Sequence, residues 1–154
     1  MSYTKSKKSM LISVIALVIA IISLGTVFMG GKSDTTANTL NSLDYSIGAI
    51  DESGKAIDSK LSVYTNEKNT VEGLEITIVD EPTITYQVFF YDEEGAFVSA
   101  SETSDADFDA ATIPENAATF RILITPVEVD GEAVEITALN KSNYTKQLEV
   151  TFNK

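Results

Sequence analysis

Two hydrophobic patterns divide the chain. Residues 10–29 form an unbroken apolar run, whereas the apolar residues from Leu43 onward alternate with polar ones. Alternation of period two is typical of half-buried β-strands. It recurs in eight short segments: 43–49, 61–63, 74–78, 84–90, 97–99, 120–125, 134–136 and 148–152. The pattern predicts an all-β fold, an antiparallel β-sandwich or jelly roll of about eight strands, with no helix after the apolar run.

Turn residues separate these segments. Asp51–Gly54 and Asp92–Gly95 each read as a polar turn that ends in glycine, and Asp130-Gly131 is the strongest hairpin signal in the chain. Pro114 has no backbone N–H to donate, so we expect it to precede a strand. The turns therefore support short antiparallel strands.

The apolar run has the length of a transmembrane helix. It holds 20 residues without a charge, which at 1.5 Å per residue span about 30 Å, the thickness of a bilayer core. Lys5, Lys7 and Lys8 precede it, and only Lys32 follows within twenty residues, so the N-terminus is expected in the cytoplasm. The predicted organisation is a cytoplasmic tail (1–9), a signal-anchor in the plasma membrane (10–29), a flexible spacer (30–42) and an extracellular domain (43–154).

A cleaved signal peptide is the alternative to an anchor. Signal peptides have an apolar core of about 7–15 residues and an A-x-A-like cleavage site. This run is longer, and residues 35–37 match such a site poorly. We therefore expect an uncleaved anchor, with secretion after cleavage as the second interpretation.

Small residues form a stripe on the predicted anchor helix. Ser9, Ser13, Ala16, Ala20 and Ser23 are spaced by four and three residues, which places them on one face. Such stripes let membrane helices approach closely, so they indicate a homo-oligomer or packing on a partner helix. Small residues are also common in any membrane helix, and this remains the plainer interpretation.

Composition narrows the classes of function. Eight basic and all 23 acidic residues follow the anchor, a net charge of −15 outside the membrane, which excludes nucleic acid and anionic lipid as natural partners. The chain has no His and no Cys, so it has no His-based catalysis, no thiol chemistry and no disulfide. A cysteine-free extracellular domain suits a bacterial surface.

Three alternating aspartates are a candidate calcium site. Asp105, Asp107 and Asp109 would share one face of an extended segment, and Ca²⁺ prefers several hard oxygen ligands. The segment does not match an EF-hand loop, because Ala110 replaces the glycine and Asn116 replaces the last glutamate. The alternative is a solvated acidic loop.

A second acidic group lies in a predicted turn. Asp92, Glu93 and Glu94 could act as acid and base only inside a cleft that raises one pKa. The sequence indicates no such cleft, so we predict a polar turn and no catalytic residues.

Aromatic and arginine side chains are the candidate ligand-binding residues. Arg121, the only Arg, is predicted on the face opposite the core, where it could bind an anion or a sugar or form a structural ion pair. Tyr64, Phe89 and Tyr91 fall on the outward parity of their strands. Exposed aromatic rings stack on sugars or bury at interfaces, but these could equally pack under a loop or line the second side of a central strand.

Residues 86–124 resemble a known group of modules. The matching stretches are YQVFFYDEEGAFVS (86–99), IPENA (113–117) and FRILI (120–124). They resemble β-sandwich modules of phage tail and baseplate proteins and of surface proteins of gut Firmicutes. The resemblance implies a sandwich architecture and a carbohydrate-binding-like function.

We therefore expect a membrane-anchored extracellular module that binds a glycan or a protein without catalysis. The alternative is a structural subunit of a cell-envelope or surface complex. An exposed face bearing Tyr and Arg would favour ligand binding, and an open strand edge would favour protein assembly. No cofactor is expected apart from the candidate structural Ca²⁺.

Overall fold

The structure, a computed structural model, describes residues 38–39 and 43–153 and confirms an all-β fold. The described residues contain eleven strands, and every strand pairing is antiparallel. The strands are β1 (Asn38–Thr39), β2 (Tyr45–Ile47), β3 (Ala49–Ile50), β4 (Ala56–Ile57), β5 (Val63–Thr65), β6 (Asn69–Thr70), β7 (Glu75–Ile78), β8 (Ile84–Tyr91), β9 (Phe97–Ala100), β10 (Thr119–Pro126) and β11 (Leu148–Phe152). The helical segments are the 3-10 helix η2 (Ala110–Thr112) and α2 (Lys141–Thr145).

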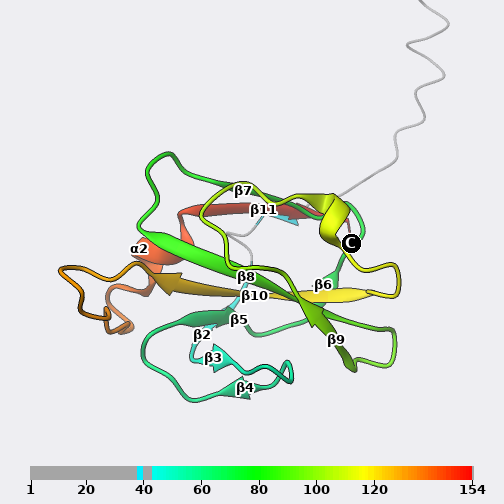
Figure 1. The fold of residues 1–154 in the computed structure, drawn as a ribbon, viewed down its shortest axis with the longest axis horizontal. Helices are drawn as coiled ribbons and strands as arrows, with labels where there is room; N and C mark the ends of the chain where they lie inside the picture. The colour runs from blue at the N-terminus through cyan, green and yellow to red at the C-terminus, as the bar shows by residue number, and fades with distance from the viewer. Residues whose placement is uncertain (1–37, 40–42, 154) are drawn as a thin grey trace, which may run out of the picture. The chain divides into compact units, whose positions relative to one another are not determined.

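The strands form two main sheets and a small hairpin. The larger sheet has the order β2-β5-β10-β8-β9, and β6 also pairs with β10. The smaller sheet has the order β1-β11-β7, and β3 pairs with β4 alone. Figure 1 shows β7 and β11 on one side of β8 and β10, with the β3–β4 hairpin on the other side. The larger sheet therefore has a core face and an outer face.

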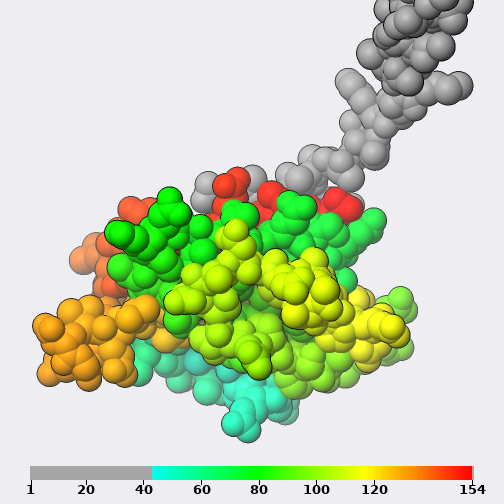
Figure 2. Space-filling view, turned by 45° about the horizontal axis from the view of Figure 1, so that its top comes forward, coloured from blue at the N-terminus to red at the C-terminus, as the bar shows by residue number. Residues whose placement is uncertain are grey.

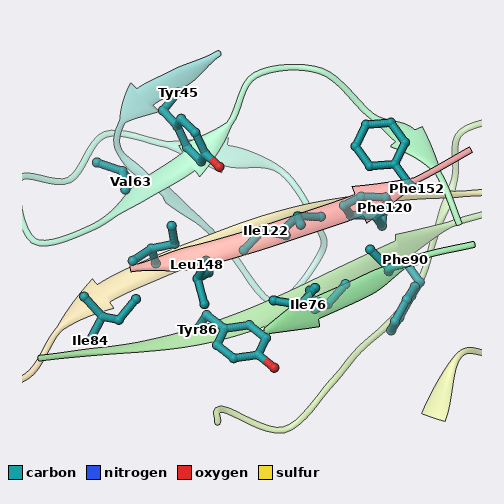
Figure 3. Close-up of a cluster of buried hydrophobic side chains, with 14 of the residues drawn as sticks. Tyr45, Val63, Ile76, Ile84, Tyr86, Phe90, Phe120, Ile122, Leu148 and Phe152 are labelled. Atoms are coloured by element: carbon teal, nitrogen blue, oxygen red, sulfur yellow. The ribbon is translucent and has the colours of Figure 1, made fainter. Parts of the chain in front are cut away.

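The main core lies between the two sheets. Alternate residues of a strand point to opposite faces, so one set from each strand turns inward. The buried set combines side chains of β8, β10, β7 and β11: Ile76, Ile84, Tyr86, Val88, Phe90, Phe120, Ile122, Ile124, Leu148, Val150 and Phe152. Figure 3 shows several of these side chains packed between the strands. The predicted alternation is confirmed in these four strands, because the buried residues are the apolar positions of the alternating segments.

Two turn predictions are confirmed, and a third is confirmed only in part. Asp51–Gly54 joins β3 to β4, and Asp92–Gly95 joins β8 to β9. Asp130 and Gly131 have φ of 55° and 79° and form a tight turn, as a type I′ hairpin requires. However, residues 134–136 are not a strand, because Ile136 buries in the core and its N–H bonds to Lys60 O instead.

The expectation of no helix beyond the apolar run is wrong for α2. Its five residues are too few to show a helical period in the sequence. The Asn140 side chain organises the preceding turn, accepting from Thr137 N at 2.7 Å and donating to Glu135 O at 3.0 Å. The helix therefore follows from a local turn and not from an amphipathic pattern.

The N-terminal predictions fall mostly outside the described residues. The tail, the anchor with its Ser13, Ala16, Ala20 and Ser23 stripe, and most of the spacer belong to residues 1–37 and 40–42. Within the described part, Asn38–Thr39 of the predicted spacer form β1, paired with Thr151 and Phe152 of β11. None of the helices in the described part is long and apolar enough to cross a membrane.

Candidate functional site

The three predicted ligand-binding residues lie on the outer face of the larger sheet. Arg121 of β10 stands opposite Phe89 of β8, and the neighbouring Leu123 stands opposite Tyr64 of β5. Tyr91 ends β8 on the same face. The structure thus brings the residues to one face, as the strand parity predicts.

Of the alternatives that the sequence leaves open for Phe89 and Tyr91, the structure shows packing under a loop. They are 3% and 2% exposed and form a second buried cluster with Ile50. The rings of Phe89 and Tyr91 each lie 6.1 Å from the ring of Phe97, and Tyr91 Oη donates to Gly54 O at 2.7 Å. The β3–β4 hairpin covers these rings, so they pack under a loop and do not form a platform for sugars.

Two cations lie beside this second cluster. Arg121 Nη2 donates to Asn66 O at 2.5 Å, and its guanidinium carbon lies 5.8 Å from the centre of the Tyr64 ring. Lys68 Nζ lies 3.8 Å from the centre of the Tyr91 ring and donates to Gly95 O at 2.5 Å. Burial lowers the pKa of Lys68, and the nearby charge of Arg121 lowers it further.

The structural ion pair expected for Arg121 is not observed. The single ion pair within 4.0 Å in the described part of the chain joins Lys60 to Glu135. Arg121 instead contacts a backbone carbonyl and an aromatic ring, interactions that hold the loop after β5 against the sheet. Its Nε is buried and has no hydrogen-bond partner among residues 38–39 and 43–153. Arg121 and Lys68 therefore pack against aromatic rings of the outer cluster, Arg121 against Tyr64 and Lys68 against Tyr91.

The candidate calcium ligands have structural partners. Asp107 Oδ1 accepts the N–H of Ile78 at 3.0 Å, and Asp109 Oδ1 accepts the N–H of Ala111 at 2.9 Å to begin η2. Asp105 is exposed. Across residues 38–39 and 43–153 no group of three or more acidic side chains could hold a metal ion. Calcium binding by these aspartates stays a prediction from the sequence.

The acidic turn borders a shallow cavity of about 470 Å³ that also contacts Glu115. Asp92 Oδ1 accepts the N–H of Ala96 at 2.7 Å, and Gly95 N donates to Asp92 O at 3.0 Å. These bonds close the β8–β9 hairpin. The predicted polar turn is confirmed, and its leading carboxylate has a structural role.

Two edges of the sheets are covered by the chain itself. At the β7 edge, Phe108 N donates to Ile76 O at 3.0 Å, and Asp107 accepts from Ile78 N. At the β2 edge, Lys141 Nζ donates to Tyr45 O at 2.7 Å. Two backbone groups of β7 and one carbonyl of β2 are therefore occupied, which hinders pairing with another chain at these edges.

The edge of β9 is open. Ser101 N donates to Val88 O at 2.8 Å, so in this antiparallel ladder the next residue, Ala100, directs its N–H and C=O away from β8. Outside the strand ladders, no backbone group of the described residues hydrogen-bonds to the backbone of Ala100. Figure 1 shows β9 at the edge of the sheet, with no other strand of the described residues beyond it.

A cavity of about 240 Å³ adjoins this open edge. It lies between the β3–β4 hairpin and strands β8 and β9, and Figure 2 shows the cyan hairpin segment protruding beside the yellow-green part of the chain. Its apolar lining residues are Ile50, Phe89, Phe97 and Ala100. Its polar lining residues are Asp51, Glu52 and Gln87.

The acidic rim of the cavity is held by the hairpin turn. Asp51 Oδ1 accepts from Ser53 N, Ser53 Oγ and Lys55 N at 2.9, 2.7 and 3.0 Å. The hydrogen bond from the Ser53 hydroxyl, followed by that from Lys55, lowers the pKa of Asp51. Glu52, in contrast, is exposed and accepts no hydrogen bond from the described residues. The rim therefore carries two carboxyl groups, those of Asp51 and Glu52.

Sequence reasoning predicted the strand 97–99 but not its open edge. Edge position depends on which strands pair across the whole sheet, and no local pattern reports it. The sequence predicts a turn at Glu52 and a strand at Phe97, and no local pattern indicates that the two residues border one cavity. The sequence feature that comes closest to indicating the cavity is the pair of D-x-x-G turns, because they mark the β3–β4 and β8–β9 hairpins that border it.

Comparison of the chain with known proteins finds no matching family model, no matching curated protein and no matching solved structure.

Proposed function

We propose that this chain is a non-catalytic binding module, held outside the plasma membrane by residues 10–29, whose β-sandwich binds an extended segment of a partner protein. The open edge of β9 beside the 240 Å³ cavity supports this proposal most directly. An extended segment can add to such an edge as a further strand, gaining affinity from main-chain hydrogen bonds and specificity from pockets for alternate side chains.

The contrast between the edges strengthens the proposal. Native proteins cover or shorten exposed edges to avoid uncontrolled pairing. Here the 105–109 segment covers β7, and Lys141 contacts the edge of β2. The bulge between Phe90 and Tyr91 shortens the regular part of β9, which restricts an added strand to the region of Ala100.

A glycan ligand has less support than a protein partner. Sugar recognition by stacking needs exposed rings. Phe89 and Tyr91 are buried under the hairpin, and Tyr64 is half-buried beside Arg121. The aromatic face that would favour a glycan is therefore largely occupied by the protein itself.

By the criterion stated from the sequence, an open strand edge favours protein assembly, so a structural subunit of a cell-envelope complex is the second candidate function. In that case β9 would hold a neighbouring subunit permanently. The two functions differ in the lifetime of the complex, since a binding module exchanges its partner and an assembly subunit does not. Sedimentation of the full chain from solubilised membranes distinguishes them, because an assembly subunit would migrate in a large complex.

The anchor can be tested cleanly because the chain contains no Cys. We expect Ala133→Cys, in an exposed loop, to react with a membrane-impermeant maleimide on intact cells, and Ser6→Cys to react only after lysis. The physical reason is the excess of Lys before the apolar run. The opposite labelling pattern contradicts the orientation, and recovery of the labelled Ala133→Cys chain in the medium indicates cleavage.

The binding edge can be tested by NMR on the full chain in nanodiscs. The probe is an octapeptide in which threonine and serine alternate and one central position carries norleucine. We expect the Ala100 amide to shift and its hydrogen exchange to slow, because its N–H gains an acceptor. Ala100→Pro removes that N–H and should weaken binding at least tenfold.

Ala133→Pro is the matched control, since its N–H has no hydrogen-bond partner among the described residues. It should bind the peptide like the unmodified chain. Circular dichroism must show that both variants keep their β-structure. Absence of any change at Ala100, or equal weakening by both substitutions, contradicts docking at β9.

A further inference from the structure

The geometry of the cavity points to the chemistry of the partner segment. Resting on the proposed function, we propose that the strand added to β9 carries a lysine or arginine, and that this side chain enters the cavity between β9 and the β3–β4 hairpin to meet Glu52 and Asp51.

The cavity lies where a side chain of an added strand would fall. Ala100 stands opposite Phe89, and both line the cavity on the outer face of the larger sheet. A residue of the added strand facing Ala100 would place its Cβ about 4.5–5.5 Å from that of Ala100. Because the alanine side chain is small, the space in front of it stays open to the incoming side chain.

The size of the cavity suits one side chain. Its volume of about 240 Å³ lies below the roughly 300–1,000 Å³ of small-molecule sites. A long unbranched side chain could enter it from the strand edge. A free ligand of drug size would not be enclosed.

The lining selects a side chain with an apolar stem and a positive end. Among the apolar lining residues Phe97 and Ala100 are half-buried, whereas Ile50 and Phe89 are only 6% and 3% exposed; Glu52 and Asp51 lie at the rim. Lysine and arginine bury their methylene stems against such surface while the charged end stays with polar groups. An aromatic ring beside the cation adds attraction.

The negative charge of the domain argues against two other occupants of the β9 edge, a second copy of this chain and an acidic segment. The chain carries a net charge of −15 after the anchor, so edge-to-edge pairing of two copies would bring strongly repelling surfaces together. An acidic side chain would meet Glu52 and Asp51 directly. A basic segment is attracted both by the rim and by the whole domain.

The test compares three octapeptides on the full chain in nanodiscs, identical except for lysine, norleucine or glutamate at the central position. We expect lysine to bind at least tenfold more tightly than glutamate, with norleucine between them. Glu52→Lys should reverse the order of lysine and glutamate. Glu52→Gln, the smaller change, should reduce the preference for lysine and guards against misfolding of the reversed variant.

Glu93→Lys is the matched control, because it makes the same change of net charge at an exposed residue of another turn that does not line this cavity. It should keep the preference for lysine. Equal affinity for the three peptides would contradict the proposal that a basic side chain enters the cavity, and so would equal effects of Glu52→Lys and Glu93→Lys. Neither result would contradict docking of the peptide at β9. If none of the peptides shifts the Ala100 amide, the proposed function and this inference both fail.

Discussion

Phe120→Ala is expected to lower the free energy of unfolding by about 3–5 kcal/mol, the range for large aromatic truncations in a packed core. Phe120 is 0% exposed, and its ring lies 5.5 Å from that of Phe152 at an interplanar angle of 80°. The substitution removes a contact between β10 of the larger sheet and β11 of the smaller one. It also leaves a cavity that rigid neighbouring strands cannot fill.

Urea unfolding of the full chain, followed by circular dichroism, measures this loss. Val129→Ala is the control, because Val129 is 62% exposed and surface truncations change stability by only about 0.5 kcal/mol or less. A loss below about 1 kcal/mol for Phe120→Ala, outside the core-truncation range, would contradict the packing of the two sheets on one core.

Gly54→Ala is expected to cost about 2–4 kcal/mol, from a left-handed backbone and from overpacking. Gly54 has φ of 76°, and a Cβ added there would lie 2.6 Å from Phe97 Cδ2 and 2.8 Å from Phe97 Cγ. The hairpin must therefore move away from the sheet. That movement would also strain the hydrogen bond from Tyr91 Oη to Gly54 O.

Gly131→Ala separates the two causes of this loss. Gly131 has φ of 79°, but an added Cβ meets no atom of the described part of the chain within 4 Å. It should cost only the backbone strain of about 1–2 kcal/mol. Urea unfolding of both variants measures the difference, and equal losses would show that the hairpin does not press on Phe97. Gly54→Ala should also weaken peptide binding at β9, since the hairpin forms one wall of the cavity.

The candidate site shows where parity reasoning succeeds and where it ends. Parity correctly placed Arg121, Tyr64 and Tyr91 on the face of the sheet opposite the core. It could not report what covers that face. The covering hairpin is built of strands of two residues each, β3 and β4, which are too short to produce a readable alternation. Strand parity therefore left open whether Phe89 and Tyr91 are exposed or packed under a loop.

The sequence by itself determined the class of fold. Strict alternation in 84–90, 120–125 and 148–152 specifies one buried face per strand, and glycine turns specify antiparallel neighbours. These signals are local, since each depends on residues adjacent in the chain. The same local character supports the predicted anchor, because a charge-free run of 20 residues needs no partner to be recognised.

Only the tertiary structure decided which edges are open and which side chains meet. The β7 edge is covered by the 105–109 segment, about thirty residues further along the chain, whereas β9 has no such cover within the described residues. The cavity beside β9 joins the Asp51–Glu52 turn to Phe97 and Ala100, which are remote in sequence. Such contacts depend on the energies of non-local pairings, which the periodicity of a single segment does not contain.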